Sequence, residues 1–144
     1  MELPSVDSKI SELVSNYETR DPFQLAKLLG ISVIEEDLGE IYGYYNRANR
    51  IKMIHINSRL SEAEQRSTAA HELGHAVLHP SENTPMLSKV TIVSELKIEK
   101  EANYFATNLI IDKESYFDES EFQDVCVYGL LESHGLPEHF ARYI

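Results

Sequence analysis

His71-Glu72-Leu73-Gly74-His75 is the stretch of this 144-residue chain that decides its fold and limits its chemistry. Two histidines four residues apart lie one above the other on a helix, so both imidazoles can face a single metal ion. Glu72 projects about 100° around the helix axis from His71, which puts its carboxylate near that ion without making it a ligand. This H-E-x-x-H spacing is typical of a catalytic zinc site carried on a helix.

The flanking residues predict a helix over 61–79 with the motif near its middle. Ser61 and Glu64 have the spacing of a capping box, and no proline interrupts the segment before Pro80. Gly74 lowers helix stability by about 1 kcal/mol relative to Ala, and the close approach of another backbone is one reason for a glycine there. The apolar back of this helix is formed by Ala69, Leu73, Ala76 and Val77. The histidines face the opposite side, as a site on the floor of a cleft requires.

A catalytic zinc site needs a third protein ligand besides the two histidines. His79 continues the four-residue series, but it lies about 12 Å along the axis from His71 at ~1.5 Å per residue. One metal ion with bonds of about 2 Å cannot bind both His71 and His79. We therefore interpret His79 as a helix-end residue near the negative end of the dipole.

A second helix, predicted over 94–111, supplies a better third ligand. Glu99 lies at the edge of its apolar stripe, where a carboxylate favours a cation as partner. We predict Glu99 as the third ligand and Asn103, one turn further on, as a residue that orients a ligating imidazole. Glu101 points to the other side and is predicted to be solvated surface. The alternative is that Glu99 is a charge at the boundary of the core. The stripe consists of Ile98, Ala102, Phe105, Ala106, Leu109 and Ile110.

The motif and the second helix together resemble a known family. The run from His71 to His79, followed by Glu99-Lys-Glu-Ala-Asn-Tyr-Phe-Ala106, is similar to the ImmA/IrrE metallopeptidases of bacteria, prophages and mobile elements. Residues 21–31 resemble the family's N-terminal helix, and residues 54–57 resemble the strand before its active-site helix.

The resemblance implies a function as well as a fold. It implies a zincin-like domain with one zinc ion, which cleaves a helix-turn-helix repressor that silences a mobile element. By the same resemblance, His71, His75 and Glu99 would bind the metal, and Glu72 would be the catalytic acid and base. The same ligands also suit manganese or iron.

The whole chain is expected to form one α+β domain over residues 1–144. We predict a helical part at 1–30, then three strands at 31–35, 41–46 and 50–56 that make a small, mainly antiparallel sheet on the active-site helix. The strand before that helix is expected to form a rim of the cleft and to pair with an extended substrate. A C-terminal helical cap is predicted over 112–144, with helical patterns near 122–132 and 137–143.

Composition limits the partners and the compartment. The net charge of −11 argues against direct nucleic-acid binding, which depends on Lys and Arg. No apolar run reaches the roughly 18 residues of a membrane span, and the first residues lack a signal-peptide pattern. Cys126 is the single cysteine, so no internal disulfide forms and a buried small hydrophobe is its expected role. We expect a cytoplasmic protein.

Two functional hypotheses follow from the sequence. The first is a zinc endopeptidase in which Glu72 activates a water molecule for peptide hydrolysis. The second is a zinc-containing regulatory module that binds and sequesters a repressor without cleaving it. A purely structural zinc site normally has four Cys or His ligands, which disfavours the second. The residue that stabilises the oxyanion stays open among Tyr44, Tyr45, Tyr104 and His134.

Overall fold

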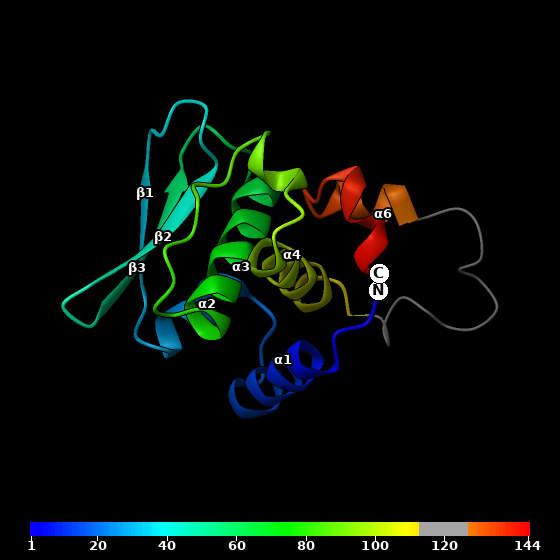
Figure 1. Cartoon of the computed structure of the whole chain (residues 1–144), viewed down its shortest axis with the longest axis horizontal. Coiled ribbons are helices and arrows are strands. Elements are labelled where there is room, and N and C mark those ends of the chain that lie inside the picture. The colour runs from blue at the N-terminus through cyan, green and yellow to red at the C-terminus, as the bar shows by residue number, and fades with distance from the viewer. Residues whose placement is uncertain (113–126) are drawn as a thin grey trace.

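The computed structural model describes residues 1–112 and 127–144, which form a three-stranded sheet with helices packed against it (Figure 1). The predicted α+β class is confirmed. The expectations for Cys126 and for residues 122–126 lie outside the described residues. No helix among the described residues is long and apolar enough to cross a bilayer.

In chain order the elements are α1 (Pro4–Tyr17), α2 (Pro22–Leu28), β1 (Ser32–Glu36), β2 (Gly43–Ala48), β3 (Ile51–Asn57), α3 (Glu62–Leu78), η1 (Thr91–Val93), α4 (Lys97–Ile110), α6 (Val127–Ser133) and η2 (Glu138–Tyr143).

Helix α3 is the central element of the fold and carries the H-E-x-x-H motif (Figure 1). The predicted capping box is formed at its start. The Glu64 amide donates to the Ser61 hydroxyl at 3.2 Å, and the Ser61 amide donates to the Glu64 carboxylate at 3.3 Å. Because two amides of the first turn thereby gain acceptors, this end of the helix is well defined. His79 is the C-cap, as the prediction of a helix-end residue requires.

The close packing of α3 on α4 explains the glycine inside the motif. A Cβ on Gly74 would lie 3.1 Å from Cδ1 of Phe105 and 3.2 Å from its Cβ. The nearest atoms that approach Gly74 belong to the Phe105 side chain, Cβ included, so α4 itself lies close to α3 at this glycine. Phe105 is fully buried, so it has little room to move away. The glycine allows the two helices to approach closely at the level of the two histidines.

The sheet is mixed, with strand order β1-β3-β2. Strand β2 pairs antiparallel with β3, whereas β1 pairs parallel with β3, so the prediction of a mainly antiparallel sheet holds for one pairing. The connection between β1 and β2 crosses the end of β3, so the two strands lie on either side of β3. Asn57, the last residue of β3, holds this connection, because its side-chain amide donates to the carbonyl oxygens of Gly39 and Ile41 at 2.8 Å each.

The central position of β3 overturns one expectation about substrate binding. The strand before the active-site helix was expected to pair with an extended substrate. Both edges of β3 are occupied, by β1 on one side and β2 on the other. In a strand that is paired on both sides, the backbone N–H and C=O groups are already hydrogen-bonded and cannot pair with a peptide. This strand therefore does not bind substrate by β-augmentation.

The turn between α6 and η2 packs on the first turns of α3, while η2 itself packs on α4. Gly135 makes the closest approach, because a Cβ there would lie 2.5 Å from the Ala63 carbonyl carbon and 2.6 Å from the Glu64 nitrogen. Its φ of +67° also disfavours any residue with a side chain. The Ser67 hydroxyl donates to the Gly135 carbonyl oxygen at 2.9 Å. The two ends of the described chain meet nearby, where the N-terminal amine lies 3.4 Å from the Arg142 carbonyl oxygen (Figure 1).

Replacing Gly135 by Ala is expected to lower the free energy of unfolding by about 2 kcal/mol or more, because the new methyl group collides with α3 and the backbone is strained. Urea denaturation followed by circular dichroism measures the change. Gly129→Ala is the matched control, since a Cβ there meets nothing within 4 Å and Ala favours a helix such as α6. Equal stability of the two variants would contradict this account of the docking.

Candidate metal centre

Three residues of the predicted site lie together in the buried middle of α3. His71, Glu72 and His75 are 2%, 0% and 0% exposed. One nitrogen of each histidine and one oxygen of the glutamate lie within 4.8 Å of one another. The two imidazole rings meet edge to face, with centroids 4.8 Å apart. Helical spacing thus brings the three side chains to one point, as the sequence predicts.

Helix α4 brings the fourth residue of the predicted site, Glu99, to the same point. Its Oε2 lies 3.2 Å from Nε2 of His71, and its Oε1 lies 3.0 Å from Nε2 of His75. Glu99 is 1% exposed, so the alternative of a charge at the core boundary is wrong. One carboxylate therefore faces both imidazoles from a second helix.

The donor set of this cluster fits a divalent metal ion. Six polar atoms of the four side chains are buried and have no hydrogen-bond partner among residues 1–112 and 127–144: His71 Nδ1 and Nε2, both Glu72 oxygens, His75 Nε2 and Glu99 Oε1. The short distances between Nε2 and carboxylate oxygen accordingly lack hydrogen-bond geometry. An orphaned buried polar group costs about 1–3 kcal/mol, so a cluster of them needs a compensating partner. Two imidazoles with one carboxylate are a donor set that zinc takes in catalytic sites.

The two buried carboxyl groups have opposite electrostatic environments. Burial raises the pKa of Glu72 to about 8, with His75 opposing the rise and the Glu99 charge adding to it. Burial also raises the pKa of Glu99, but the neighbouring His71 and His75 outweigh it and lower that pKa to about 2. Glu99 thus holds its negative charge, while Glu72 is the carboxyl that can carry a proton. Such a separation is common where two acids have different roles.

A second layer of polar side chains lies behind His75. Nδ1 of His75 is 3.0 Å from Nδ1 of His79, and Nε2 of His79 is 3.2 Å from Oε1 of Glu101. Burial lowers the pKa of the His79 imidazole, although Glu101 opposes this. The prediction that Glu101 is solvated surface is wrong, because α4 crosses the end of α3 and leaves this side chain 21% exposed beside His79.

Asn103, the predicted orienting residue, is fully buried on α4. Its amide nitrogen lies 3.3 Å from the Ile92 carbonyl oxygen and donates to it. Its Oδ1 and the Nδ1 of His71 both lack a hydrogen-bond partner within the described part of the chain. The role of Asn103 toward an imidazole stays a prediction.

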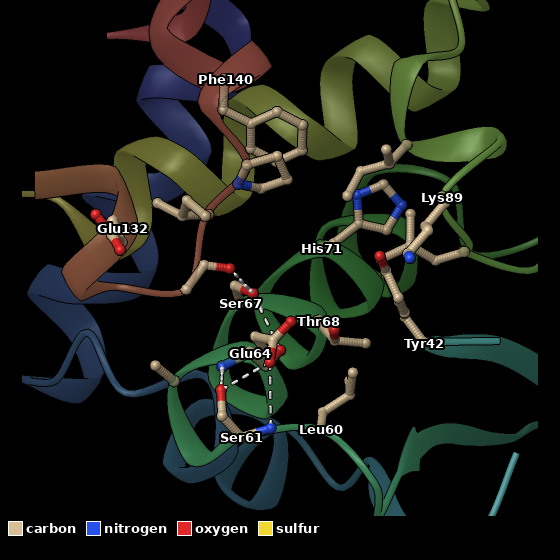
Figure 2. A pocket seen from close by; sticks show the side chains of 16 residues that line it. Tyr42, Leu60, Ser61, Glu64, Ser67, Thr68, His71, Lys89, Glu132 and Phe140 are labelled. Carbon is tan, nitrogen blue, oxygen red and sulfur yellow. Dashed lines mark hydrogen bonds between the residues drawn. The ribbon is translucent and has the colours of Figure 1, made fainter. Parts of the chain in front are cut away.

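A cavity of about 450 Å³ opens beside His71 (Figure 2). Figure 2 shows Tyr42 and Lys89 on the side of the cavity where His71 lies, with Glu132 across from them. The Tyr42 segment is held there by Leu87, whose carbonyl oxygen accepts from the Tyr42 amide at 2.7 Å. The apolar lining comes from Leu60, Leu87, Ile92, Leu136 and Phe140. An apolar cavity next to a few polar groups is the usual form of a substrate site.

The predicted donors to an oxyanion lie elsewhere. The Tyr45 hydroxyl donates to the Pro80 carbonyl oxygen at 2.9 Å, the Tyr104 hydroxyl donates to Asp7 at 2.8 Å, and Tyr44 stacks on His55. These three and His134 are absent from the lining of the cavity as the described residues form it. Tyr42 and Lys89 line the cavity instead, and sequence reasoning missed both because no local pattern shows that residues 42 and 43 pair with Leu87 beside α3.

Comparison with known proteins gives a consistent set of relatives. Residues 26–143 match the sequence profile of the peptidase M78 family, described as the IrrE N-terminal-like domain. The chain is 42% identical over 107 residues to "Uncharacterized immunity region protein 2" of Bacillus phage phi105, covering 74% of this chain and 68% of that protein. It is 30% identical over 108 residues to "Metallopeptidase ImmA" of Bacillus subtilis, covering 74% of this chain and 63% of that protein.

Adding zinc to metal-stripped protein is expected to raise the free energy of unfolding, because a ligand that binds only the folded cluster stabilises it by mass action. The gain is about 2.7 kcal/mol at a free zinc concentration of 100 times Kd. Thermal unfolding with and without a chelator measures it. Glu99→Ala should abolish the gain, whereas His55→Ala, a change on β3 outside the cluster, should keep it. Wild-type protein that unfolds identically with and without zinc would rule out a metal centre.

Proposed function

The chain belongs to the ImmA/IrrE family of metallopeptidases, and on that premise we propose that it is a metal-dependent endopeptidase acting on a protein held in the cavity beside His71. The observation that supports this most is the approach of one buried carboxylate, Glu99, to 3.2 Å and 3.0 Å from the Nε2 atoms of His71 and His75. These three side chains would hold the metal. We take zinc as the metal, because two histidines with one glutamate suit its catalytic coordination.

Each residue of the cluster has a separate task in this proposal. A divalent metal, when bound, supplies Lewis-acid chemistry that polarises a peptide carbonyl and acidifies water. Glu72 accepts the proton of the attacking water and passes it to the amine that leaves. Both Glu72 oxygens are buried and without a hydrogen-bond partner in the described structure, so they are available to hold that proton.

The cavity supports the binding and charge-stabilising parts of the reaction. Its apolar lining excludes water and accepts an apolar side chain of the substrate. Tyr42 and Lys89, on the His71 side, are the donors proposed to stabilise the negative carbonyl oxygen. Burial raises the pKa of Tyr42, so its hydroxyl stays protonated and can donate.

The substrate we propose is a helix-turn-helix repressor that keeps a mobile element silent, met in the cytoplasm where such repressors act. One relative is named for a phage immunity region and another is named Metallopeptidase ImmA, which supports a substrate of this kind. The net charge of −11 favours the approach of a basic DNA-binding protein. The same charge disfavours direct contact with nucleic acid.

Glu72→Gln is expected to lower peptide cleavage by about 100- to 10,000-fold, the usual contribution of a general acid and base. Zinc content should stay at the wild-type level, because Glu72 is not among the proposed ligands. Cleavage followed by gel electrophoresis, with zinc measured by mass spectrometry, tests both statements. Glu62→Gln, an exposed change on the same helix, is the control and should cleave normally. Full cleavage by the Glu72 variant would defeat the mechanism.

Incubation of the zinc-loaded protein with a helix-turn-helix repressor from the same mobile element is expected to yield two discrete fragments. Mass spectrometry of the fragments identifies the bond that breaks. A stable complex with an intact repressor, in the same sample that binds zinc, would instead support a protein that sequesters its partner.

A further inference from the structure

His79 and Glu101 extend the histidine cluster beyond its first layer. We propose that His79 is a positioning residue, which, held by Glu101, keeps His75 in the tautomer that leaves its Nε2 free for the metal. The proposal rests on the metal centre described above. It assigns a task to two side chains that neither bind the metal nor line the cavity.

Three short contacts form a continuous row from α4 through the end of α3 and back to α4. Glu101 Oε1 is 3.2 Å from His79 Nε2, and His79 Nδ1 is 3.0 Å from His75 Nδ1. His75 Nε2 is 3.0 Å from Glu99 Oε1. His75 is fully buried and His79 is 8% exposed, so water competes little for these contacts. Two glutamates of one helix thus lie at the two ends of a pair of histidines from the other.

The positions of the protons follow from the chemistry of the row. An ionised carboxylate only accepts hydrogen bonds, so Glu101 requires a proton on Nε2 of His79. A neutral imidazole has one N–H, which leaves Nδ1 of His79 as an acceptor. With the proposed metal ion between His75 Nε2 and Glu99, that nitrogen would carry no proton, so the facing Nδ1 of His75 is the donor and holds the single proton of His75. The Nε2 lone pair is then the one that binds the metal.

The opposite pair of tautomers would prevent His75 from binding the metal. If His79 carried its proton on Nδ1, it would donate to Nδ1 of His75 and move the His75 proton to Nε2. A protonated Nε2 cannot bind a metal ion. Glu101 therefore selects between two arrangements that the pair of histidines alone leaves open. Metal-binding histidines commonly donate their second ring N–H to a fixed acceptor in this way.

The row of side chains orients only one of the two histidine ligands, His75. Nδ1 of His71 has no hydrogen-bond partner in the described parts of the chain, so nothing comparable orients that ring there. The row exists on the His75 side because His79 follows His75 by one helical turn at the C-cap of α3. We therefore expect substitutions of His79 to act through His75.

The test compares three variants of the full chain. His79→Leu removes the acceptor, and His79→Asn restores one, because the amide oxygen takes the place of Nδ1. His55→Leu is the matched control, since His55 also contacts a glutamate, Glu36 at 2.7 Å, but lies on β3 outside the row. Zinc affinity is measured by competition with a chromophoric chelator. Thermal unfolding of each metal-free variant checks that it folds.

His79→Leu is expected to weaken zinc binding by about 10- to 100-fold, the usual effect of removing a residue that orients a metal ligand. His79→Asn should bind within a few-fold of wild type, and His55→Leu should bind as wild type does. Wild-type affinity in His79→Leu would overturn the proposal, as would an equal loss in the Leu and Asn variants.

Nitrogen NMR of the zinc-loaded wild-type protein tests the two tautomers directly. The proposal expects the His75 proton on Nδ1 and the His79 proton on Nε2, and Glu101→Leu should shift part of the His79 population to Nδ1. A wild-type His79 proton on Nδ1 would overturn the proposal even if His79→Leu failed to fold. Failure of the wild-type protein to bind zinc at all would instead contradict the metal centre, so the two failures are distinguishable.

Discussion

The contact between one carboxylate of α4 and two imidazoles of α3 is the constraint on which the site depends. Taking charged and polar groups out of water is expensive unless they find well-placed partners. Here Glu99 lies 3.0–3.2 Å from both histidines, yet several of the atoms involved form no hydrogen bond in the described structure. The fold therefore places unsatisfied polar atoms at its centre. A divalent cation would satisfy them at once, which is why this cluster is read as a binding site instead of a structural network.

The same helix pair provides both the room and the rigidity that such a site needs. Gly74 allows the ring of Phe105 to lie against α3, and the capping box at Ser61 fixes where α3 begins. The neighbouring core is built from small side chains, which bring the two helix backbones close: Ala69, Ala70, Ala76, Ala102 and Ala106. A rigid frame holds ligands within the narrow range of geometry that metal binding and catalysis require. The crossing of α4 over the end of α3 also places Glu101 against His79, so one packing arrangement builds both layers of the centre.

The cavity beside His71 is assembled from parts of the chain that are far apart in sequence. The floor is the first half of α3, one wall comes from Tyr42 and Leu87, and the other comes from the docked C-terminal elements. Gly135 permits that docking, because only a residue without a side chain fits against the first turn of α3. The family relationship explains the helix with the H-E-x-x-H motif, whereas under the proposed function the lining of this cavity would decide which peptide can reach it. The C-terminal elements thus have a part in the site although they carry none of its ligands.

How much of the molecule could be read from the sequence depends on how local each feature is. The H-E-x-x-H spacing, the capping box and the apolar edge around Glu99 are set by the periodicity of a helix, so the sequence by itself determined the helix that carries the motif and the four residues that meet at the centre. Helical and strand patterns together also determined the α+β class. Pairing between elements follows from packing that no short pattern encodes. The parallel pairing of β1 with β3 takes the connection between β1 and β2 across the end of β3, where the Asn57 side chain bonds to it. Tyr42 and Lys89 meet beside α3 where residues 42 and 43 pair with Leu87, and Glu101 reaches His79 because two helices cross. Helical geometry is repeated at every turn and is therefore predictable, whereas a crossing of helices or a strand order is decided by the sum of many weak contacts that exist only in the folded chain.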